Sequence, residues 1–177
     1  FGAARDAASE LPRLRSLLVS WRGTRVVEYF AQGAGRARPS NVKSVSKSVI
    51  SALVGIAIER GYLKSANQPI GPFFPEHKLD HRKSRITIED LLTMRAGLES
   101  TCFDNYGAWV GSRNWVGYVL SRPLQSEPGT SMEYSTGNSH LLSAILTRAT
   151  GKSTWAFAQE TLAKPLGFTL GQWPRDP

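Results

Sequence analysis

The feature that most constrains the fold is the segment from Ser44 to Arg60, which predicts a buried helix. Its apolar residues cover most of the circumference of a helix instead of one stripe, and such a helix has to be packed on several sides. Gly61 follows directly and is well placed to end the helix in a left-handed conformation. The apolar positions are Val45, Val49, Ile50, Leu53, Val54, Ile56, Ala57 and Ile58.

Two predicted strands precede this helix. Residues 17–21 and 25–30 are rich in β-branched and aromatic side chains, and Arg22-Gly23-Thr24 between them is a turn sequence, which together indicate a hairpin. A weak helix interrupted by Pro12 is expected before it, over residues 4–16. Residues 4–30 are thus predicted to form a helix followed by two antiparallel strands.

Further helices are predicted after the buried one. Thr87-Ile88-Glu89-Asp90 resembles a capping box that begins a helix containing Met94 and closed by Gly97. The other predicted helices cover residues 114–121, 138–150 and 154–164. The expected class is α+β. We expect one unit at residues 1–43, with the N-terminal helix and hairpin, and a second at 44–177, with the buried helix and a helical subdomain.

Composition excludes several classes of function. The net charge of +8 suggests nucleic-acid binding, but the basic residues are spread along the 177-residue chain without a basic helix or zinc-finger spacing, so no nucleic-acid partner is expected. No apolar run is long enough for a membrane span. The single cysteine, Cys102, is interpreted as a bystander, His77 and His81 as surface residues, and no metal or cofactor is expected. Because the sequence begins with Phe1, we expect a start further upstream, and the localisation, periplasmic and secreted included, stays open.

Two Ser-x-x-Lys patterns occur back to back, at Ser40 with Lys43 and at Ser44 with Lys47. Such a pair can act chemically in the first turn of a helix, because residues three apart share a face and the amine then reaches the hydroxyl. Ser44 lies where the buried helix begins, among backbone N–H groups that can stabilise an oxyanion. Ser40 follows Pro39 in a loop, so the second pattern is favoured.

Lys47 and Tyr134 are candidate partners of Ser44. Partial desolvation of Lys47 and the nearby Lys43 both favour the neutral amine that a base has to be. Tyr134 follows a turn and precedes a helix, a place from which a side chain can reach a neighbouring helix end. Each residue also has a plainer interpretation, as a surface lysine and as a half-buried aromatic side chain.

Four stretches together resemble a known superfamily. They are SVSK at 44–47, ITIEDLLTMRAGL at 86–98, PGTSMEYS at 128–135 and LAKPLGF at 162–168. In this order they are similar to the serine β-lactamases and penicillin-binding proteins, above all to class C β-lactamases, family VIII esterases and nylon-oligomer hydrolases. The resemblance implies a β-lactamase/transpeptidase-like fold and a serine hydrolase in which Ser44 is acylated, Lys47 accepts its proton and Tyr134 returns a proton to the leaving group.

The sequence departs from the family pattern at the substrate side of the site. Thr136 stands where the family usually has the asparagine that holds the amide side chain of a β-lactam, and Asn138 two residues later is either its substitute or a helix cap. We therefore predict Thr136 and Asn138 as substrate-binding residues and a small-molecule ester or amide as the substrate. A β-lactamase or D-alanyl-D-alanine peptidase, and a non-catalytic binding or scaffold relative, are the alternatives.

The family's third motif, Lys-Thr-Gly or His-x-Gly, is not found in this sequence. The chain thus resembles the N-terminal half of the fold, with the later strands missing. A two-stranded hairpin with an open edge cannot cover the buried helix alone. We expect the remaining part as a second polypeptide, a cleaved C-terminal half or a segment outside this sequence.

Overall fold

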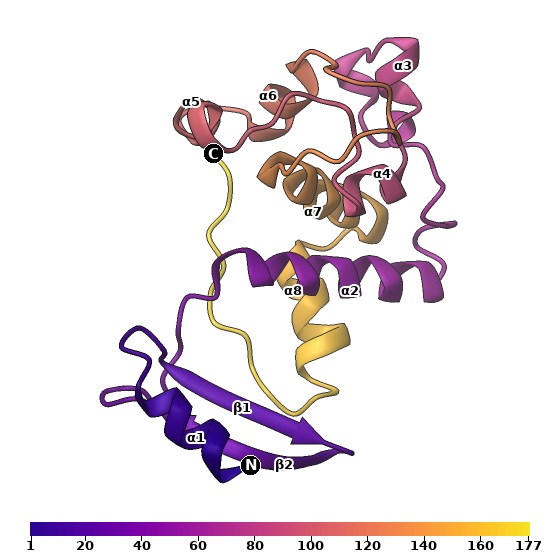
Figure 1. Ribbon diagram of the computed structural model, residues 1–177. Helices are drawn as coiled ribbons and strands as arrows, with labels where there is room; N and C mark the ends of the chain where they lie inside the picture. The colour runs from indigo at the N-terminus through magenta and orange to yellow at the C-terminus, as the bar shows by residue number, and fades with distance from the viewer. The chain divides into compact units, whose positions relative to one another are not determined.

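The computed structural model describes all residues from Phe1 to Pro177, and the chain divides into two compact units, Phe1–Lys43 and Ser44–Pro177 (Figure 1). The first unit holds the only sheet, and the second consists of helices and loops. The predicted α+β class is confirmed. No helix has the length and apolar character needed to cross a bilayer.

The first unit is a helix packed on a hairpin. Helix α1 (Gly2–Ser9) contacts strand β2 (Thr24–Phe30), which pairs with the antiparallel strand β1 (Ser16–Trp21). The predicted hairpin is confirmed. Arg22 and Gly23 form its turn with φ angles of +50° and +78°, the left-handed conformation at both central residues that the tightest hairpin turns require.

A 3₁₀ turn, Lys43–Val45, spans the boundary between the two units and leads into helix α2 (Ser46–Glu59) of the second. Short 3₁₀ turns and helices fill the middle of the unit, and two longer stretches of helix close it. In chain order these are η2 (Gly71–Phe73), η3 (Pro75–His77), α3 (His81–Ser84), α4 (Ile88–Leu92), η4 (Phe103–Asn105), α5 (Tyr106–Val110), α6 (Trp115–Ser121), α7 (Thr136–Thr150), α8 (Thr154–Ala158) and the π-helical turn η5 (Gln159–Ala163).

Helix α7 is the centre of the second unit. It packs against α2, α4, α6 and α8 (Figure 1). Leu53 and Ala57 of α2 and Leu141 and Ile145 of α7 are completely buried, so the two helices share one core. Helix α2 nevertheless buries only one face. Its small residues, such as Gly55, are exposed. The core thus fixes the angular position of both helices about their axes and, with it, the side chains at their N-terminal ends.

Several predicted helix ends need correction. Helix α2 begins at Ser46, so Ser44 lies in the 3₁₀ turn before it. Helix α4 ends at Leu92, and Met94 lies outside it with φ of +59°. The capping box of α4 is confirmed by reciprocal hydrogen bonds between Thr87 and Asp90. The left-handed end of α2 is confirmed as well, with φ of +75° at Gly61.

Candidate active site

Ser44 and Lys47 are joined at the start of helix α2. Lys47 lies one turn beyond Ser44, and its ammonium Nζ donates to Ser44 Oγ at 3.4 Å. Ser44 is exposed, whereas Lys47 is half-buried. The 3₁₀ turn before α2 continues into the helix, since Val45 already has helical φ and ψ of −59° and −26°. The geometry therefore leaves the hydroxyl accessible to a substrate while the amine is held beside it.

Lys47 also contacts the start of helix α7, far away in the sequence. Its Nζ donates to Thr136 Oγ1 at 3.3 Å, across 89 residues of chain. The same ammonium lies over the ring of Tyr134, 5.2 Å from its centroid, a cation–π contact. Lys47 thus meets the face of the Tyr134 ring, and no hydrogen bond joins the Tyr134 hydroxyl to Lys47. The structure thus brings Ser44, Lys47, Tyr134 and Thr136 together around one amine.

A short loop, Ser100–Cys102, holds the segment that carries Tyr134 and Thr136. The Ser100 hydroxyl donates to the carbonyl oxygen of Tyr134 at 2.7 Å. The Thr101 N–H donates to Ser135 Oγ at 3.2 Å. Thr101 and Ser135 are 0% and 2% exposed, so these hydrogen bonds are shielded from water and their loss would leave buried polar groups without partners. We call Ser100–Cys102 the clamp loop.

The clamp loop also caps helix α7. Ser135 occupies the N-cap position, but its side chain makes no capping hydrogen bond. Instead the N–H of Gly137 donates to Thr101 Oγ1 at 2.8 Å, and the N–H of Thr136 donates to Cys102 Sγ at 3.2 Å. Two of the backbone donors that every helix leaves unpaired at its start are therefore satisfied by a neighbouring loop.

Gly137 is required by the closeness of this packing. A Cβ atom at this position would lie 2.7 Å from Val119 Cγ2 and 2.8 Å from Thr101 Oγ1. Both neighbours are buried, at 1% and 0% exposure, and have little room to move. The absence of a side chain at Gly137 lets the clamp loop approach the backbone of α7 closely enough for hydrogen bonding.

Asn138 is placed differently from the other predicted site residues. It is the third residue of α7 and is 2% exposed. Its Nδ2 donates to Met94 Sδ at 3.8 Å, while its buried Oδ1 has no hydrogen-bond partner. The alternative that Asn138 caps the helix is wrong, because Ser135 holds that position.

The family model for beta-lactamase matches residues 18–177. The chain belongs to the beta-lactamase family. Solved structures are similar to the chain at the level of the fold. Among curated protein sequences, none matches this beta-lactamase-family chain.

Two solved structures cover most of the chain. One is a presumed β-lactamase from Bacteroides dorei, with a TM-score of 0.72 and 20% identity over 94% of this chain and 49% of the other. The second is a presumed 6-aminohexanoate-dimer hydrolase from Bacillus anthracis, with a TM-score of 0.65 and 18% identity over 87% of this chain and 44% of the other.

A third structure, a family VIII carboxylesterase, has a TM-score of 0.60 and 23% identity over 70% of this chain and 34% of the other. At these identities the likeness establishes the β-lactamase/transpeptidase-like fold. The beta-lactamase-family chain spans about half the length of the first two structures.

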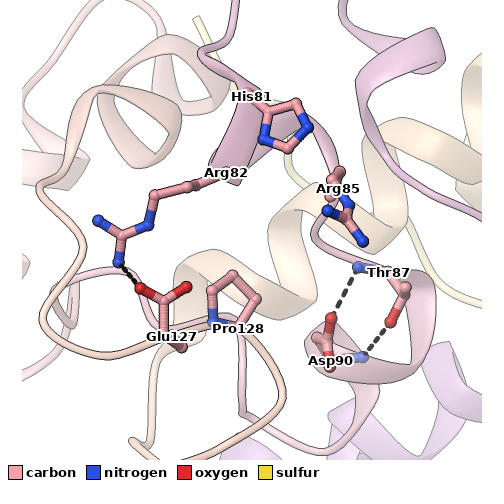
Figure 2. A pocket seen from close by; sticks show the side chains of 7 residues that line it. All are labelled: His81, Arg82, Arg85, Thr87, Asp90, Glu127 and Pro128. Carbon is pink, nitrogen blue, oxygen red and sulfur yellow. Dashed lines mark hydrogen bonds and ion pairs between the residues drawn. The ribbon is translucent and has the colours of Figure 1, made fainter.

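Two cavities of this beta-lactamase-family chain lie apart from Ser44. One, of about 360 Å³, is lined by side chains from α3, α4 and the turn at Glu127 and Pro128 (Figure 2). There Arg82 pairs with Glu127, and Thr87 and Asp90 serve the capping box of α4. Its polar groups are thus largely engaged with one another. None of the predicted catalytic residues lines it, so the candidate site rests on the contacts of Lys47.

The other cavity, of about 810 Å³, is lined partly by Trp115, His140 and Trp155. Burial lowers the pKa of His140, against the opposing effect of nearby Asp176, and so favours the neutral imidazole. No group of three or more His, Cys, Asp or Glu side chains is arranged to hold a metal ion. Neither cavity supplies a competing catalytic constellation.

Sequence reasoning missed the clamp loop. Its three residues carry short polar side chains that no motif distinguishes from an ordinary turn, and Cys102 was interpreted as a bystander. The one usable signal is Gly137, a glycine directly before the predicted helix at 138–150, where a missing side chain permits a close backbone approach. Nothing in the sequence says which segment makes that approach.

Proposed function

We propose that this chain carries the nucleophile and proton-transfer groups of a serine hydrolase, which forms an acyl-enzyme on Ser44 and cleaves an ester or amide. The observation that carries the proposal is the position of Lys47 Nζ, within 3.4 Å of Ser44 Oγ and over the ring of Tyr134. Membership of the beta-lactamase family supports it. So do the hydrolase and carboxylesterase named among the similar structures.

In the first step the neutral amine of Lys47 accepts the proton of Ser44 as Oγ attacks the substrate carbonyl carbon. The carbonyl π electrons move to oxygen and give a tetrahedral oxyanion. We propose that the N–H of Ser44, at the entrance to α2, is one donor that stabilises this oxyanion. Exposure of Ser44 admits the substrate, and the half-buried setting of Lys47 restricts competing water.

In the second step the carbon–oxygen or carbon–nitrogen bond of the substrate breaks. The leaving group takes a proton from the Tyr134 hydroxyl, and Lys47 returns its newly acquired proton to Tyr134, so the charge balances. Water then attacks the acyl carbon and releases Ser44 with its hydroxyl restored. Transfer between Lys47 and Tyr134 requires the tyrosine to turn its hydroxyl toward the amine, because the ammonium now lies over the ring face.

The substrate class is proposed from the residue at position 136. Thr136 contacts Lys47 at 3.3 Å, and its short side chain offers no amide group to a β-lactam side chain. We therefore propose a small ester or amide ahead of a β-lactam, with Thr136 at the edge of the substrate site. Asn138, at 2% exposure, stays a prediction as a substrate-binding residue, and its burial favours an indirect contribution.

We further propose that the fold's remaining strands supply the other groups of the site. The basis is that the chain covers 49% and 44% of the first two similar structures. No finding supports a second polypeptide as the carrier of these strands, so that part stays a prediction. Intact-mass spectrometry of the purified protein records every polypeptide present and tests it directly.

The proposed function is tested by labelling with a fluorophosphonate, followed by intact-mass spectrometry. We expect one adduct, lost in Ser44→Ala. Ser40→Ala is the matched control, because Ser40 begins the neighbouring Ser-x-x-Lys pattern, and it should keep the adduct. An adduct that survives in Ser44→Ala, or no adduct in the wild type, contradicts the proposal. Hydrolysis of a short acyl ester compared with a chromogenic cephalosporin then separates the substrate classes.

A further inference from the structure

We propose that Cys102 is a positioning residue for the base Lys47, acting through the hydroxyl of Thr136. The inference deepens the proposed function and rests on it for its catalytic meaning. It concerns three atoms in a row, which are Cys102 Sγ, Thr136 Oγ1 and Lys47 Nζ. Of these three residues only Lys47 contacts Ser44, so Cys102 and Thr136 act through Lys47.

The sulfur of Cys102 is bound to Thr136 at two points. It accepts the Thr136 N–H at 3.2 Å and lies 3.2 Å from Thr136 Oγ1. The first contact fixes the sulfur beside the helix start, so the second does not depend on a flexible side chain. On its other side, Thr136 Oγ1 is 3.3 Å from Lys47 Nζ. The hydroxyl therefore lies between a sulfur acceptor and an amine.

The direction of the Thr136 hydroxyl hydrogen decides whether Lys47 can act as a base. A neutral amine has one lone pair, and it has to point at the hydroxyl of Ser44 to take its proton. If Thr136 donated to Lys47, that lone pair would be occupied. If Thr136 donates to Cys102 Sγ instead, its oxygen accepts an N–H from Lys47 and leaves the lone pair free for Ser44.

Cys102 thus provides the acceptor that turns the Thr136 hydroxyl in the productive direction. The same direction suits the ammonium formed after proton transfer, because Lys47 then donates to Thr136 Oγ1 again. No reorientation of Thr136 is needed during the step. The plainer alternative is that Cys102 only caps helix α7 through the Thr136 N–H, which would affect stability and nothing else.

The test compares rates of fluorophosphonate acylation of Ser44 as a function of probe concentration, which separates the maximal rate from the half-saturating concentration. Cys102→Ala is expected to lower the maximal rate about fivefold, the effect of one net hydrogen bond, with little change in half-saturation. Cys102→Ser keeps an acceptor and should restore most of the rate. Thr136→Val is expected to slow acylation, and Thr136→Ser to rescue it.

The decisive comparison is the double variant. If Cys102 acts through the Thr136 hydroxyl, Cys102→Ala causes no further loss of rate in the Thr136→Val background, although it still lowers the melting temperature by removing the cap. Rate losses that multiply would overturn the proposal. Ser153→Ala is the matched control, because it removes the side-chain cap of α8, a 3.2 Å hydrogen bond to the Ala156 N–H, and should lower stability without slowing acylation.

A second measurement decides the inference even if Ser44 is never acylated. In the Ser44→Ala background, the rate of Lys47 acetylation by acetic anhydride reports whether its lone pair is free, with exposed Lys78 as the internal reference. Slower acetylation in Cys102→Ala, relieved by adding Thr136→Val, supports the positioning role. Equal rates in all three proteins overturn it. Failure of the proposed function would instead show as an unlabelled Ser44 in the wild type.

Discussion

Helices α2 and α7 both bring their N-terminal ends to Lys47, but the two ends are built in different ways. The start of α2 carries an exposed Ser44 and has no side-chain cap. The start of α7 is buried, and the clamp loop takes its first backbone donors. In the proposed mechanism the substrate arrives at the exposed end, while the buried end holds the partners of Lys47 in place. The proposed nucleophile and its rigid support thus lie at the starts of separate helices.

The largest expected effect comes from removing the amine that joins the two ends. Lys47→Ala should lower the rate of Ser44 acylation by roughly 10²- to 10⁴-fold, the usual contribution of a general base. The measurement is the time course of the fluorophosphonate adduct by intact mass.

Lys47→Arg separates proton acceptance from charge. A guanidinium keeps the positive charge near Tyr134 but stays protonated at neutral pH and cannot act as a base. We expect it to be as slow as Lys47→Ala. An arginine variant that acylates at the wild-type rate would assign Lys47 a purely electrostatic role and remove the base from the mechanism.

The second prediction compares one glycine in each helix. Gly137→Ala places a Cβ within 2.7 Å of Val119 and 2.8 Å of Thr101. Overpacking of this kind costs about 1–3 kcal/mol, against a gain of roughly 1 kcal/mol in helix propensity. The net expectation is a loss of about 0–2 kcal/mol in the free energy of unfolding, together with slower acylation because Thr136 is displaced.

Gly55→Ala in α2 is the matched control. Nothing lies within 4 Å of the Cβ position there, and the residue is exposed. Only the propensity gain remains, so the protein should become more stable by about 0.5–1 kcal/mol. Denaturant unfolding of both variants checks the pair. Equal stabilisation by the two substitutions would mean that the clamp loop yields easily and that the start of α7 is not rigid.

The same contrast explains what the sequence could and could not reveal. The hairpin, the apolar pattern of α2 and the capping box of Thr87 with Asp90 depend on neighbouring residues, so periodicity and turn chemistry predicted them. The three clamp-loop residues bond across 34 to 36 positions, and such pairs depend on the path of the whole chain. The meeting of Lys47 with Tyr134 was expected only because the motifs resemble a family.

Two local errors have local causes. Helix α5 (Tyr106–Val110) was not predicted, because five residues give too short a pattern and Asn105 before it makes no side-chain cap. The apolar side chain of Met94 predicts a place in a helix, yet its backbone is left-handed, with φ of +59°. There the chain turns to let the N–H of Glu133 bond to the Met94 carbonyl at 2.8 Å. A tertiary contact has overridden a helix-forming residue.

The smallest expected effect lies at the C-terminal end of α7. There the ion pair that attaches the helix, between Arg148 and Glu76, is exposed and not buried. Arg148 in the last turn of α7 donates to Glu76 Oε2 at 3.1 Å, and this hydrogen bond lowers the pKa of Glu76 to about 2. A lowered pKa means that the folded state favours the charged carboxylate. The stabilisation is therefore present above the ordinary value of 4.5 and is lost as the pH falls toward about 2.

Glu76→Gln should reduce the melting temperature slightly at pH 7, and this difference should vanish as the pH approaches 2. Added salt should shrink it, because water and ions screen a pair this exposed. Glu89→Gln, at an exposed carboxylate of α4 that forms no ion pair, is the matched control for lost charge. A Glu76 effect as large as that of Gly137→Ala would mean that α7 is held as firmly at its exposed end as at its buried one. The division between a rigid start and a lightly tethered end would then have to be given up.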